Sequence, residues 1–422
     1  MSVNEEILLV EPAELPPSDP KAAKNTAIYA FSFVVMSAIM NPFSHITEPT
    51  ERAFDITAGE IIYVGMVIAV SGIFINPFMP YILSKVSLRK AHLISSIILV
   101  ITSILRLGMK RNFSILIITS FMNGPAFCLI NTGQMAFIKL WHHPQRYAKV
   151  NPILKLAQIL LAALFALSPF IFINEKEQDK EILLDQTMNY LRFLLIFPII
   201  YFVLVLFFAD EKPENPIYET KTAEESLPFF TQVKGAFKIL FSWEFQLVCL
   251  PYVFVRMGFF ISFSCINFFF ESIHSLQIYG SLTFMIGTLA GLLGSYFFDI
   301  FFSKKVSLDL KIFQVAVIGA SATQLVAFQY QSAIFLGLTY FIIGLMALNQ
   351  ASRFFTVFQH KMMNKNINIV NMIMMQYFIV IAIGSTFLNL SLFEQNGKAG
   401  IKNLILIFGI FVSPLPFLFA NK

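Results

Sequence analysis

The sequence ADEKPENPIYETKTAEESLPFFTQVKGAFK, from Ala209 to Lys238, separates two long tracts that are rich in Phe, Ile and Leu. Hydrocarbon excludes its charges and its prolines, because each polar group left without a partner there costs several kcal/mol. The stretch therefore lies in water. Since it divides the 422 residues almost in half, it raises the question of whether the halves are copies of one unit.

The composition on either side of this stretch is that of a membrane protein. Hydrophobic residues make up 57% of the chain and charged residues only 13%, and the apolar runs reach the length of about 20 residues that crosses a bilayer. The net charge of +5 is small, and it gives no reason to expect nucleic acid as a partner. The sequence thus predicts an all-α protein whose partner is the lipid bilayer.

Twelve apolar runs are long enough to span. We expect helices near 26–47, 59–84, 90–109, 113–140, 148–174, 188–209, 243–272, 276–302, 309–330, 332–360, 367–391 and 401–420. The predicted organisation is a disordered cytosolic tail, a six-helix bundle, a cytosolic linker and a second six-helix bundle, at 1–25, 26–209, 210–242 and 243–422. The tail has no basic segment followed by an apolar core, so no cleavable signal peptide is expected.

Charge placement supports this topology. Basic residues gather in the turns after the even-numbered helices, and acids such as Glu48 and Glu51 gather in the opposite turns. Under the positive-inside rule this places both termini and the linker in the cytosol. An offset of roughly 215–219 residues superposes the basic turns of the two halves and two in-helix glutamines, Gln158 and Gln376. We interpret the halves as an internal repeat.

Metal and enzyme chemistry are not expected. Cys128, Cys249 and Cys265 lie in apolar runs, which argues against disulfides and a cysteine metal site, and the six histidines lack ligand spacing. No phosphate cradle, nucleophile elbow or pair of catalytic carboxylates is present. The sequence predicts no cofactor and no enzyme; His142 and His143 are the only candidates for a catalytic set at a membrane face.

Four stretches carry a family resemblance. They are the fourth helix ending in Trp141 with Pro144 and Arg146, the run Ala157–Leu160, the run Phe208–Pro216, and Gly291–Gly294 followed by Asp299. On these the chain resembles the major facilitator superfamily and, within it, the transporters related to the feline leukaemia virus subgroup C receptor, solute carrier family 49. The resemblance implies alternating access between two six-helix bundles, facilitated diffusion, and a choline- or ethanolamine-like solute.

The resemblance also implies site residues. Glutamines of the fifth and eleventh helices reach the central cavity in this family, and Gln158 and Gln376 match them; helix-to-helix hydrogen bonds are the alternative. The family's choline cage is not copied, since Met40 and Ile261 stand near its Trp and Tyr positions. Further aromatic residues, Phe43 and Phe260 among them, are candidates for a replacement wall.

Arg256 lies about 20 Å into the predicted seventh helix. An arginine at that depth costs at least about 2.5 kcal/mol, so it should face the cavity or pair with an acid. It would repel choline and suit a carboxylate or phosphate. By contrast, Arg106 and Arg192 stand at helix ends, where we expect their side chains to snorkel to the interface.

We expect basic turns to close the cytosolic side. In the second turn Ser84 replaces the superfamily's Asp, so the closure should be lopsided. The predicted gate residues are Arg89, Arg146, Asp299, Lys304 and Lys305. The linker is expected to carry an amphipathic helix built on Phe229, Phe230, Val233 and Phe237.

The predicted function is a facilitative carrier of a small polar organic solute. The alternatives are a carrier of an organic anion or zwitterion, which Arg256 would favour, a carrier of haem, and a non-transporting receptor or sensor on the same fold. We expect a monomer. The plasma membrane is favoured over an internal membrane.

Overall fold

The structure is a computed structural model that describes most of the first half, the linker helix and short pieces of the second half. The described residues are 19–40, 42–43, 46–110, 112–143, 150, 154, 164–165, 167–174, 176–213, 228–243, 278–279, 282–283, 285–287, 289–290, 319, 322–327, 329–339, 341–342, 372–373, 376, 379–380 and 383. Within them the regular structure is helical and contains no strand.

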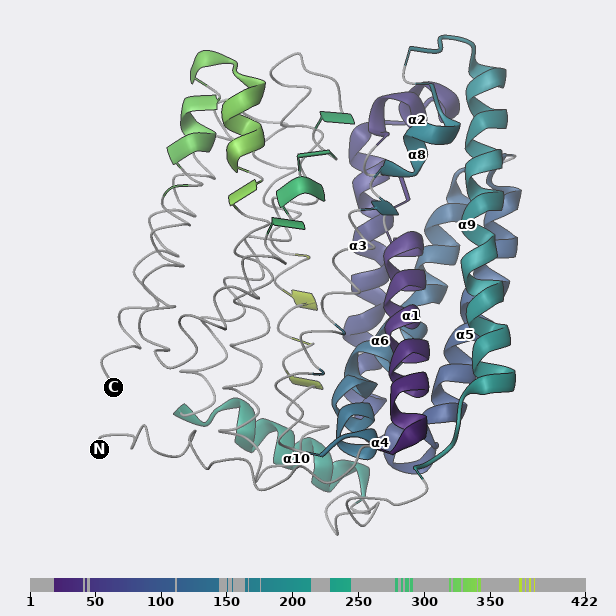
Figure 1. Ribbon diagram of the computed structural model, residues 1–422, viewed down its shortest axis with the longest axis vertical. Helices are drawn as coiled ribbons and strands as arrows, with labels where there is room; N and C mark the ends of the chain where they lie inside the picture. Colours follow the sequence, from purple (N-terminus) through teal and green to yellow (C-terminus); the bar gives the residue numbers. More distant parts are fainter. Residues whose placement is uncertain are drawn as a thin grey trace.

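Long helices stand side by side in the first half (Figure 1). They are α1 (Pro20–Met40), α3 (Ala58–Ile75), α5 (Leu88–Arg106), α6 (Ser114–Trp141) and α9 (Lys180–Phe208). α6 packs against α3, α5 and α1, while α9 packs against α5 and α1. In the described part of the chain, 5 helical segments are long and apolar enough to cross a membrane, and they fall on these elements.

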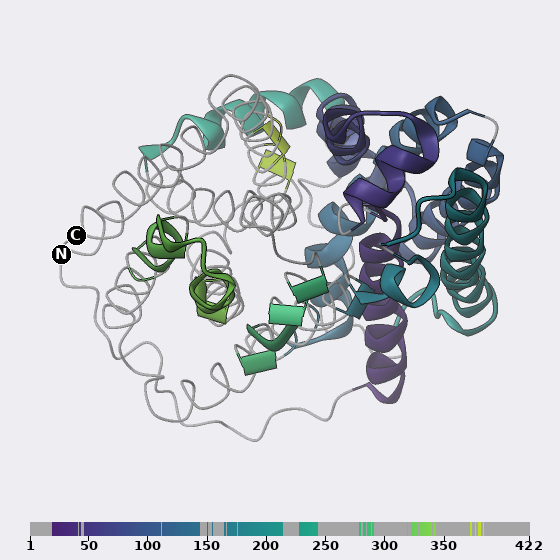
Figure 2. The ribbon, with the colours of Figure 1, turned by 90° about the horizontal axis from the view of Figure 1, so that it is seen from above.

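Short elements cover the two ends of the bundle. α2 (Thr47–Phe54) and α8 (Pro169–Phe172) lie at the top of Figure 1, and α10 (Phe229–Leu240) runs across the bottom. The second predicted helix is interrupted, because α3 is followed by η2 (Asn76–Phe78) and α4 (Met79–Lys85). η3 (Leu107–Lys110) extends α5. The view in Figure 2 shows the same bundle from above.

Two helices begin earlier than predicted. α1 starts at Pro20, inside the tail expected to be disordered, where the Asp19 carboxylate accepts the backbone N–H of Lys21 at 2.8 Å. α9 starts at Lys180 instead of residue 188, and the Asp179 carboxylate accepts the N–H groups of the next turn. Each acid satisfies helix N–H donors that would otherwise lack partners. The charged segments before residues 26 and 188, which were predicted to lie outside the helices, therefore form helix N-termini that acidic side chains cap.

The bundle is apolar on its outside. On α5 the side chains of Ile94, Ile97, Ile101 and Ile104 are exposed, whereas polar side chains face inward. α9 exposes its own row, which consists of Ile196, Ile199, Ile200, Val203 and Phe207. Apolar surface of this extent is costly in water and suits lipid. The lipid-facing surface expected from composition is thus present on both helices.

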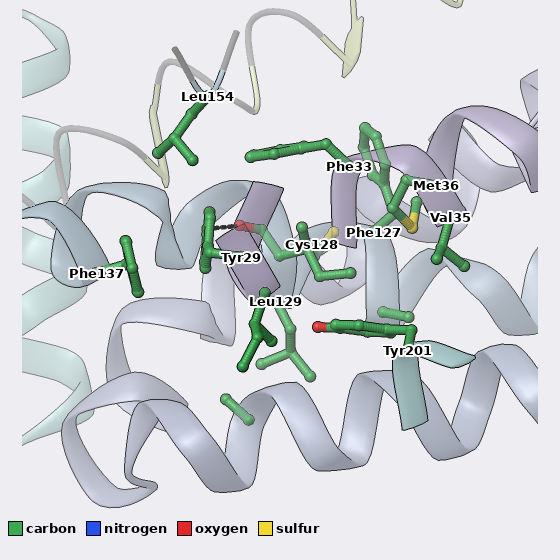
Figure 3. Packing of buried hydrophobic residues seen from close by; sticks show 14 of the residues in the cluster. Tyr29, Phe33, Val35, Met36, Phe127, Cys128, Leu129, Phe137, Leu154 and Tyr201 are labelled. Atoms are coloured by element: carbon green, nitrogen blue, oxygen red, sulfur yellow. Dashed lines mark hydrogen bonds between the residues drawn. The ribbon is translucent and has the colours of Figure 1, made fainter. Parts of the chain in front are cut away.

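Buried aromatic rings join α1 to its neighbours. Tyr29 on α1 stacks on Phe137 of α6 with centroids 4.4 Å apart, and its edge meets His92 of α5 at 4.7 Å. The Tyr29 hydroxyl donates to the carbonyl of Ile130, so the phenol is satisfied without water. Figure 3 shows this packing beside Tyr201 of α9. α1 is therefore held at the centre of the first half.

The amphipathic helix expected in the linker is present as α10. Phe230, Phe237 and Phe241 share one exposed face with Lys234, and the rings of Phe237 and Phe241 stack 6.4 Å apart. Ala236 is buried on the opposite face, and α10 contacts α4. Aromatic rings beside lysines suit a membrane–water interface. The position of α10 across the helix ends in Figure 1 agrees with that placement.

The described residues of the second half include the predicted boundary between the ninth and tenth helices. The expected ninth and tenth helices meet at Gln331, whose φ of 50° makes a tight turn. Across this turn the hydroxyls of Thr323 and Thr339 lie 2.8 Å apart. A Cβ added at Gly337 would approach Thr283, in the predicted eighth helix, to 3.0 Å, so the tenth segment also packs closely against the eighth. The boundary predicted between 330 and 332 is confirmed.

Candidate functional site

A buried amide at the end of α3 connects the two halves. Asn76 is 0% exposed, and its Nδ2 donates to the carbonyl of Met372 at 2.8 Å and to Oε1 of Gln376 at 3.1 Å. Its Oδ1 accepts from the Thr132 hydroxyl of α6 at 2.9 Å. We call Asn76, Thr132, Met372 and Gln376 the amide contact. Every group in it is neutral, and both ends of the Asn76 amide have partners.

Pro77 explains why Gln376 binds at this position. A proline has no N–H, so Pro77 leaves the carbonyl of Ile73, four residues earlier, without a helical donor. Nε2 of Gln376 supplies that donor at 3.2 Å. An unsatisfied carbonyl inside a membrane protein is costly, which gives this bond a physical purpose. The interruption of α3 at Asn76 and Pro77 thus creates the place where the halves meet.

Glycine allows close approach beside the amide contact. A Cβ added at Gly72 would lie 2.9 Å from Cδ1 of Ile379 and 3.5 Å from Sγ of Cys128. Ile379 is 0% exposed and belongs to the same apolar cluster as Cys128. Among the described residues, the halves therefore meet through a neutral polar contact set in apolar packing. Such a surface can separate without exposing a charge.

Of the predicted substrate residues, the structure describes Gln376 and Phe43. Gln376 faces the first half, as the amide contact shows. Phe43 is 1% exposed and packs its ring against Tyr190 of α9 at 6.5 Å, so it lies within the first half's own core. The other candidates, Gln158, Arg256 and Phe260, lie outside the described residues. The substrate role of all five stays a prediction.

One predicted gate residue is described. Arg89, at the start of α5, donates from Nη2 to the carbonyl of Leu206 at 2.9 Å. Leu206 lies in the last turn of α9, so this contact stays within the first half, where a cation suits a helix C-terminus. Arg146, Asp299, Lys304 and Lys305 lie outside the described residues. The inter-half gate built on these residues stays a prediction.

A polar cluster ties α1 to the end of α9 on the same side. Asp210 lies 2.6 Å from the Lys24 ammonium and accepts from Nδ2 of Asn25 at 2.9 Å. Burial acts to raise the pKa of Asp210, but hydrogen bonds from Lys24 and Asn25 and the charges of Lys24 and Lys21 outweigh it and lower that pKa. Asp210 is therefore held ionised. It belongs to the stretch that carries part of the family resemblance.

Arg106 does not snorkel as expected; that prediction is wrong. The side chain turns inward between α1 and α6, and the residue is 2% exposed. Nη1 donates to the carbonyl of Ile39 at 2.8 Å, Nη2 to the Ser120 hydroxyl at 3.0 Å and Nε to the Thr119 hydroxyl at 3.3 Å. The helix end is covered by α1, so the guanidinium finds protein acceptors before it reaches water.

The sequence did contain a signal for this inward orientation. Ser95, Leu99, Thr102 and Arg106 recur at intervals of three or four residues, which places them on one face of α5, and all four are buried. That face is opposite to the isoleucines in register. Arg106 continues the buried row formed by Ser95, Leu99 and Thr102, so this periodicity would have placed its side chain inside the bundle.

Histidine chemistry has no support in the described part of the chain. His142 is 8% exposed, and its Nε2 lies 2.8 Å from the Thr26 hydroxyl, joining α6 to α1. No group of three or more His, Cys, Asp or Glu side chains that could hold a metal occurs among the described residues. His142 therefore acts in helix packing.

The comparisons with known proteins agree with this architecture. Residues 26–387 match the profile of the Major Facilitator Superfamily. The crystal structure of the fucose:proton symporter FucP of E. coli, in a variant form, aligns with a TM-score of 0.62 and 14% sequence identity, covering 94% of this chain and 97% of that one. At this identity the likeness shows the fold alone. A search of curated protein sequences found no significant match.

The profile covers most of the chain, which includes both halves and the linker. The predicted fold class, two bundles of the major facilitator type, is confirmed by the profile and by the structural likeness. The number of helices, twelve, is consistent with it and stays a prediction. Members of this family are multi-pass membrane transporters and not enzymes. This chain belongs to the Major Facilitator Superfamily.

Proposed function

We propose that this transporter moves a small polar organic solute by alternating access between its two halves. The observation that carries the proposal is the amide contact, in which Asn76 and Gln376 join residues 300 positions apart. The bonds are neutral, and each can be exchanged for water at a net cost of about 1 kcal/mol. A permanent core would instead interlock large side chains. The contact supports a surface that opens and closes.

We propose the solute class from the family resemblance. The transporters related to the feline leukaemia virus subgroup C receptor suggest a choline- or ethanolamine-like solute that diffuses down its gradient. The proposed binding residues are Gln158, Gln376, Phe43, Phe260 and Arg256, and the proposed cytosolic gate consists of Arg89, Arg146, Asp299, Lys304 and Lys305. The proposed assembly is a monomer in the plasma membrane with both termini in the cytosol.

A second solute class, an organic anion or zwitterion, has an observation of its own. Arg106 is a buried cation whose hydrogen-bond acceptors are all neutral. Trimethylammonium groups are recognised by aromatic rings and repelled by a guanidinium, whereas carboxylates and phosphates are attracted to it. No described residue favours the remaining alternatives, a haem carrier and a non-transporting receptor.

Uptake by the purified protein in liposomes tests the transport function. We expect radiolabelled choline or ethanolamine to enter faster than into empty liposomes, and Gln376→Ala to reduce the rate several-fold by removing both inter-half bonds of this side chain. Gln329→Ala is the matched control, because Gln329 is exposed. Uptake equal to that of empty liposomes for both solutes would remove this solute class. An equal loss in the Gln329→Ala variant would remove the proposed role of Gln376.

A further inference from the structure

Arg106 places a positive charge inside the first half, and its hydrogen-bond acceptors among the described residues are neutral. It is 2% exposed, and its three hydrogen bonds go to a backbone carbonyl and two hydroxyls. Among the described residues no acid forms an ion pair with it. A buried charge is normally paired, because desolvation costs more than neutral hydrogen bonds return. The charge of Arg106 therefore needs an explanation beyond helix packing.

The end of α1 offers partial compensation. Ile39 is next to the last residue of α1, so its carbonyl belongs to the negative end of that helix. A helix C-terminus acts as roughly half a negative charge. Arg106 also stands in the last turn of α5, so the C-terminal carbonyls of its own helix add to this effect. A helix end contributes up to about 2 kcal/mol in a partly buried site, which is less than the several kcal/mol that desolvating an ion costs. Helix capping alone does not account for an arginine at this position.

A further hydrogen-bond donor lies one turn along α6 from Ser120. Nδ2 of Asn123 is buried and has no hydrogen-bond partner in the described structure. Oδ1 of Asn123 accepts from the Thr102 hydroxyl, one turn from Arg106 on α5. We call Arg106, Thr102, Thr119, Ser120 and Asn123 the arginine cluster.

Excess positive charge and excess donors are what an anion requires. The Ser120 hydroxyl that now accepts from Arg106 can rotate and donate to an anionic oxygen, whereas the Thr119 hydroxyl already donates to the carbonyl of Leu116. The carbonyl of Ile39 covers the guanidinium from α1. Movement of the end of α1 would uncover the cluster without disturbing the pairing of α5 with α6.

We propose that the arginine cluster recognises an anionic oxygen group, a carboxylate or phosphate, on the solute that this protein carries. The inference rests on the proposed transport function and specifies its substrate class. Arg106 binds the anion through the two N–H groups now directed at Ser120 and Thr119. Asn123 supplies a further donor from the next turn of α6. A solute with an amine and an anionic group fits both this cluster and the family resemblance.

The test compares three probes that share a trimethylammonium group: choline, betaine and phosphocholine. Purified protein in a neutral detergent is heated with each probe, so that no lipid headgroup competes. We expect betaine or phosphocholine to raise the unfolding temperature at concentrations at least about tenfold lower than choline requires, because hydrogen bonds to charged groups are the stronger ones. An equal response to all three probes overturns the inference.

Two variants separate recognition from folding. Arg106→Gln should weaken binding of the anionic probe about tenfold or more and leave choline unchanged, whereas Arg192→Gln, on the exposed face of α9, should change neither. Asn123→Asp keeps the side-chain shape and places a carboxylate near the guanidinium. It should fold as stably as the wild type and lose the anionic probe. Retained binding in Asn123→Asp overturns the inference.

Transport measured in parallel keeps the two proposals distinct. Choline uptake by liposomes without preferential binding of either anionic probe would sustain the transport function and overturn the anion site. Binding of betaine or phosphocholine that Arg106→Gln abolishes, with no uptake of any probe, would sustain the anion site and remove the transport function. Uptake of betaine or phosphocholine that Arg106→Gln abolishes supports both proposals.

Discussion

The amide contact and the arginine cluster are both buried and polar, but they differ in how completely their groups are satisfied. In the amide contact each end of the Asn76 side chain has a partner and no charge is involved. In the arginine cluster no described acid pairs with the charge, and Nδ2 of Asn123 has no partner among the described residues. The first crosses the two halves, and the second lies within one of them. The satisfied groups of the amide contact suit a surface that opens and closes, whereas the arginine cluster suits a site that binds a ligand.

The largest expected effect comes from fixing the amide contact. We expect a short thiol-specific cross-linker between Asn76→Cys and Gln376→Cys to abolish uptake into liposomes, because the wild-type side chains lie 3.1 Å apart and the halves must separate in each cycle. Cys249 and Cys265 are first replaced by Ser, while Cys128 is buried. Release of the cross-linker should restore uptake. Full uptake with the cross-link in place would contradict a moving contact.

The next effect contrasts two glycines. Gly124→Ala places a Cβ 2.4 Å from Cβ of Ser71, between α3 and α6 of one half. Gly72→Ala comes closest to the flexible end of Ile379 across the halves, and it meets Sγ of Cys128 at an ordinary contact distance of 3.5 Å. We expect Gly124→Ala to lower the free energy of unfolding by about 1–3 kcal/mol and Gly72→Ala by clearly less. Thermal unfolding in detergent measures both. Equal losses would mean that the contact between the halves is as rigid as the packing within one.

A third prediction separates bonds that cross the halves from the bond that does not. Asn76→Ala removes the two crossing bonds of this side chain and keeps the crossing bond from Gln376 to Ile73. Oε1 of Gln376 and the Thr132 hydroxyl lose their partner, which we expect to cost about 1–3 kcal/mol of the closed arrangement. Thr132→Val removes only the bond within the first half and should cost less. Labelling of a cysteine at position 379, where Ile379 packs against Gly72 across the halves, reports the opening and leaves Gln376 in place. Greater labelling in Thr132→Val than in Asn76→Ala would contradict the assignment.

Sequence reasoning located one partner of the amide contact and missed the other. A glutamine inside an apolar run must find a hydrogen bond, and Gln376 does so. Asn76 lies inside 59–84, which was predicted as one uninterrupted helix, and it was not singled out as a polar residue in need of a partner. The carbonyl that Pro77 leaves free shows why an amide is needed nearby, but which distant segment supplies it depends on how the halves pack. That pairing was beyond sequence patterns.

Arg106 was misjudged for a different reason. Distance from the helix end suggested water, but whether water is there depends on what covers the end, and α1 covers it. The register of Ser95, Leu99 and Thr102 was readable in the sequence and pointed inward. The periodicity of the polar residues indicates which face of α5 is buried. The position of Arg106 at the helix end led instead to the wrong prediction. Polar residues in a membrane helix are better placed by register than by depth.

The smallest expected effect lies outside both clusters, at Asp210. Its pKa is lowered in the folded protein, so the ionised carboxylate stabilises the fold above the unfolded-state pKa of about 4, and this contribution is lost as the pH falls through the lower folded-state pKa. Because the Asp210 side chain is 27% exposed, we expect Asp210→Asn to cost at most about 1 kcal/mol near neutral pH. Thermal unfolding of both proteins at several pH values measures the difference.

The dependence on pH and salt distinguishes this pair from the buried clusters. The difference between wild type and Asp210→Asn should shrink in acid, where the carboxylate is protonated in both folded and unfolded chains, and it should shrink in high salt. Asp185→Asn, which breaks the exposed pair with Lys110, is the matched control and should change stability less, because the Asp185 side chain is 68% exposed. A cost for Asp210→Asn that stays constant from neutral to acid pH would show that the Asn25 amide, and not the Lys24 charge, holds the ends of α1 and α9 together.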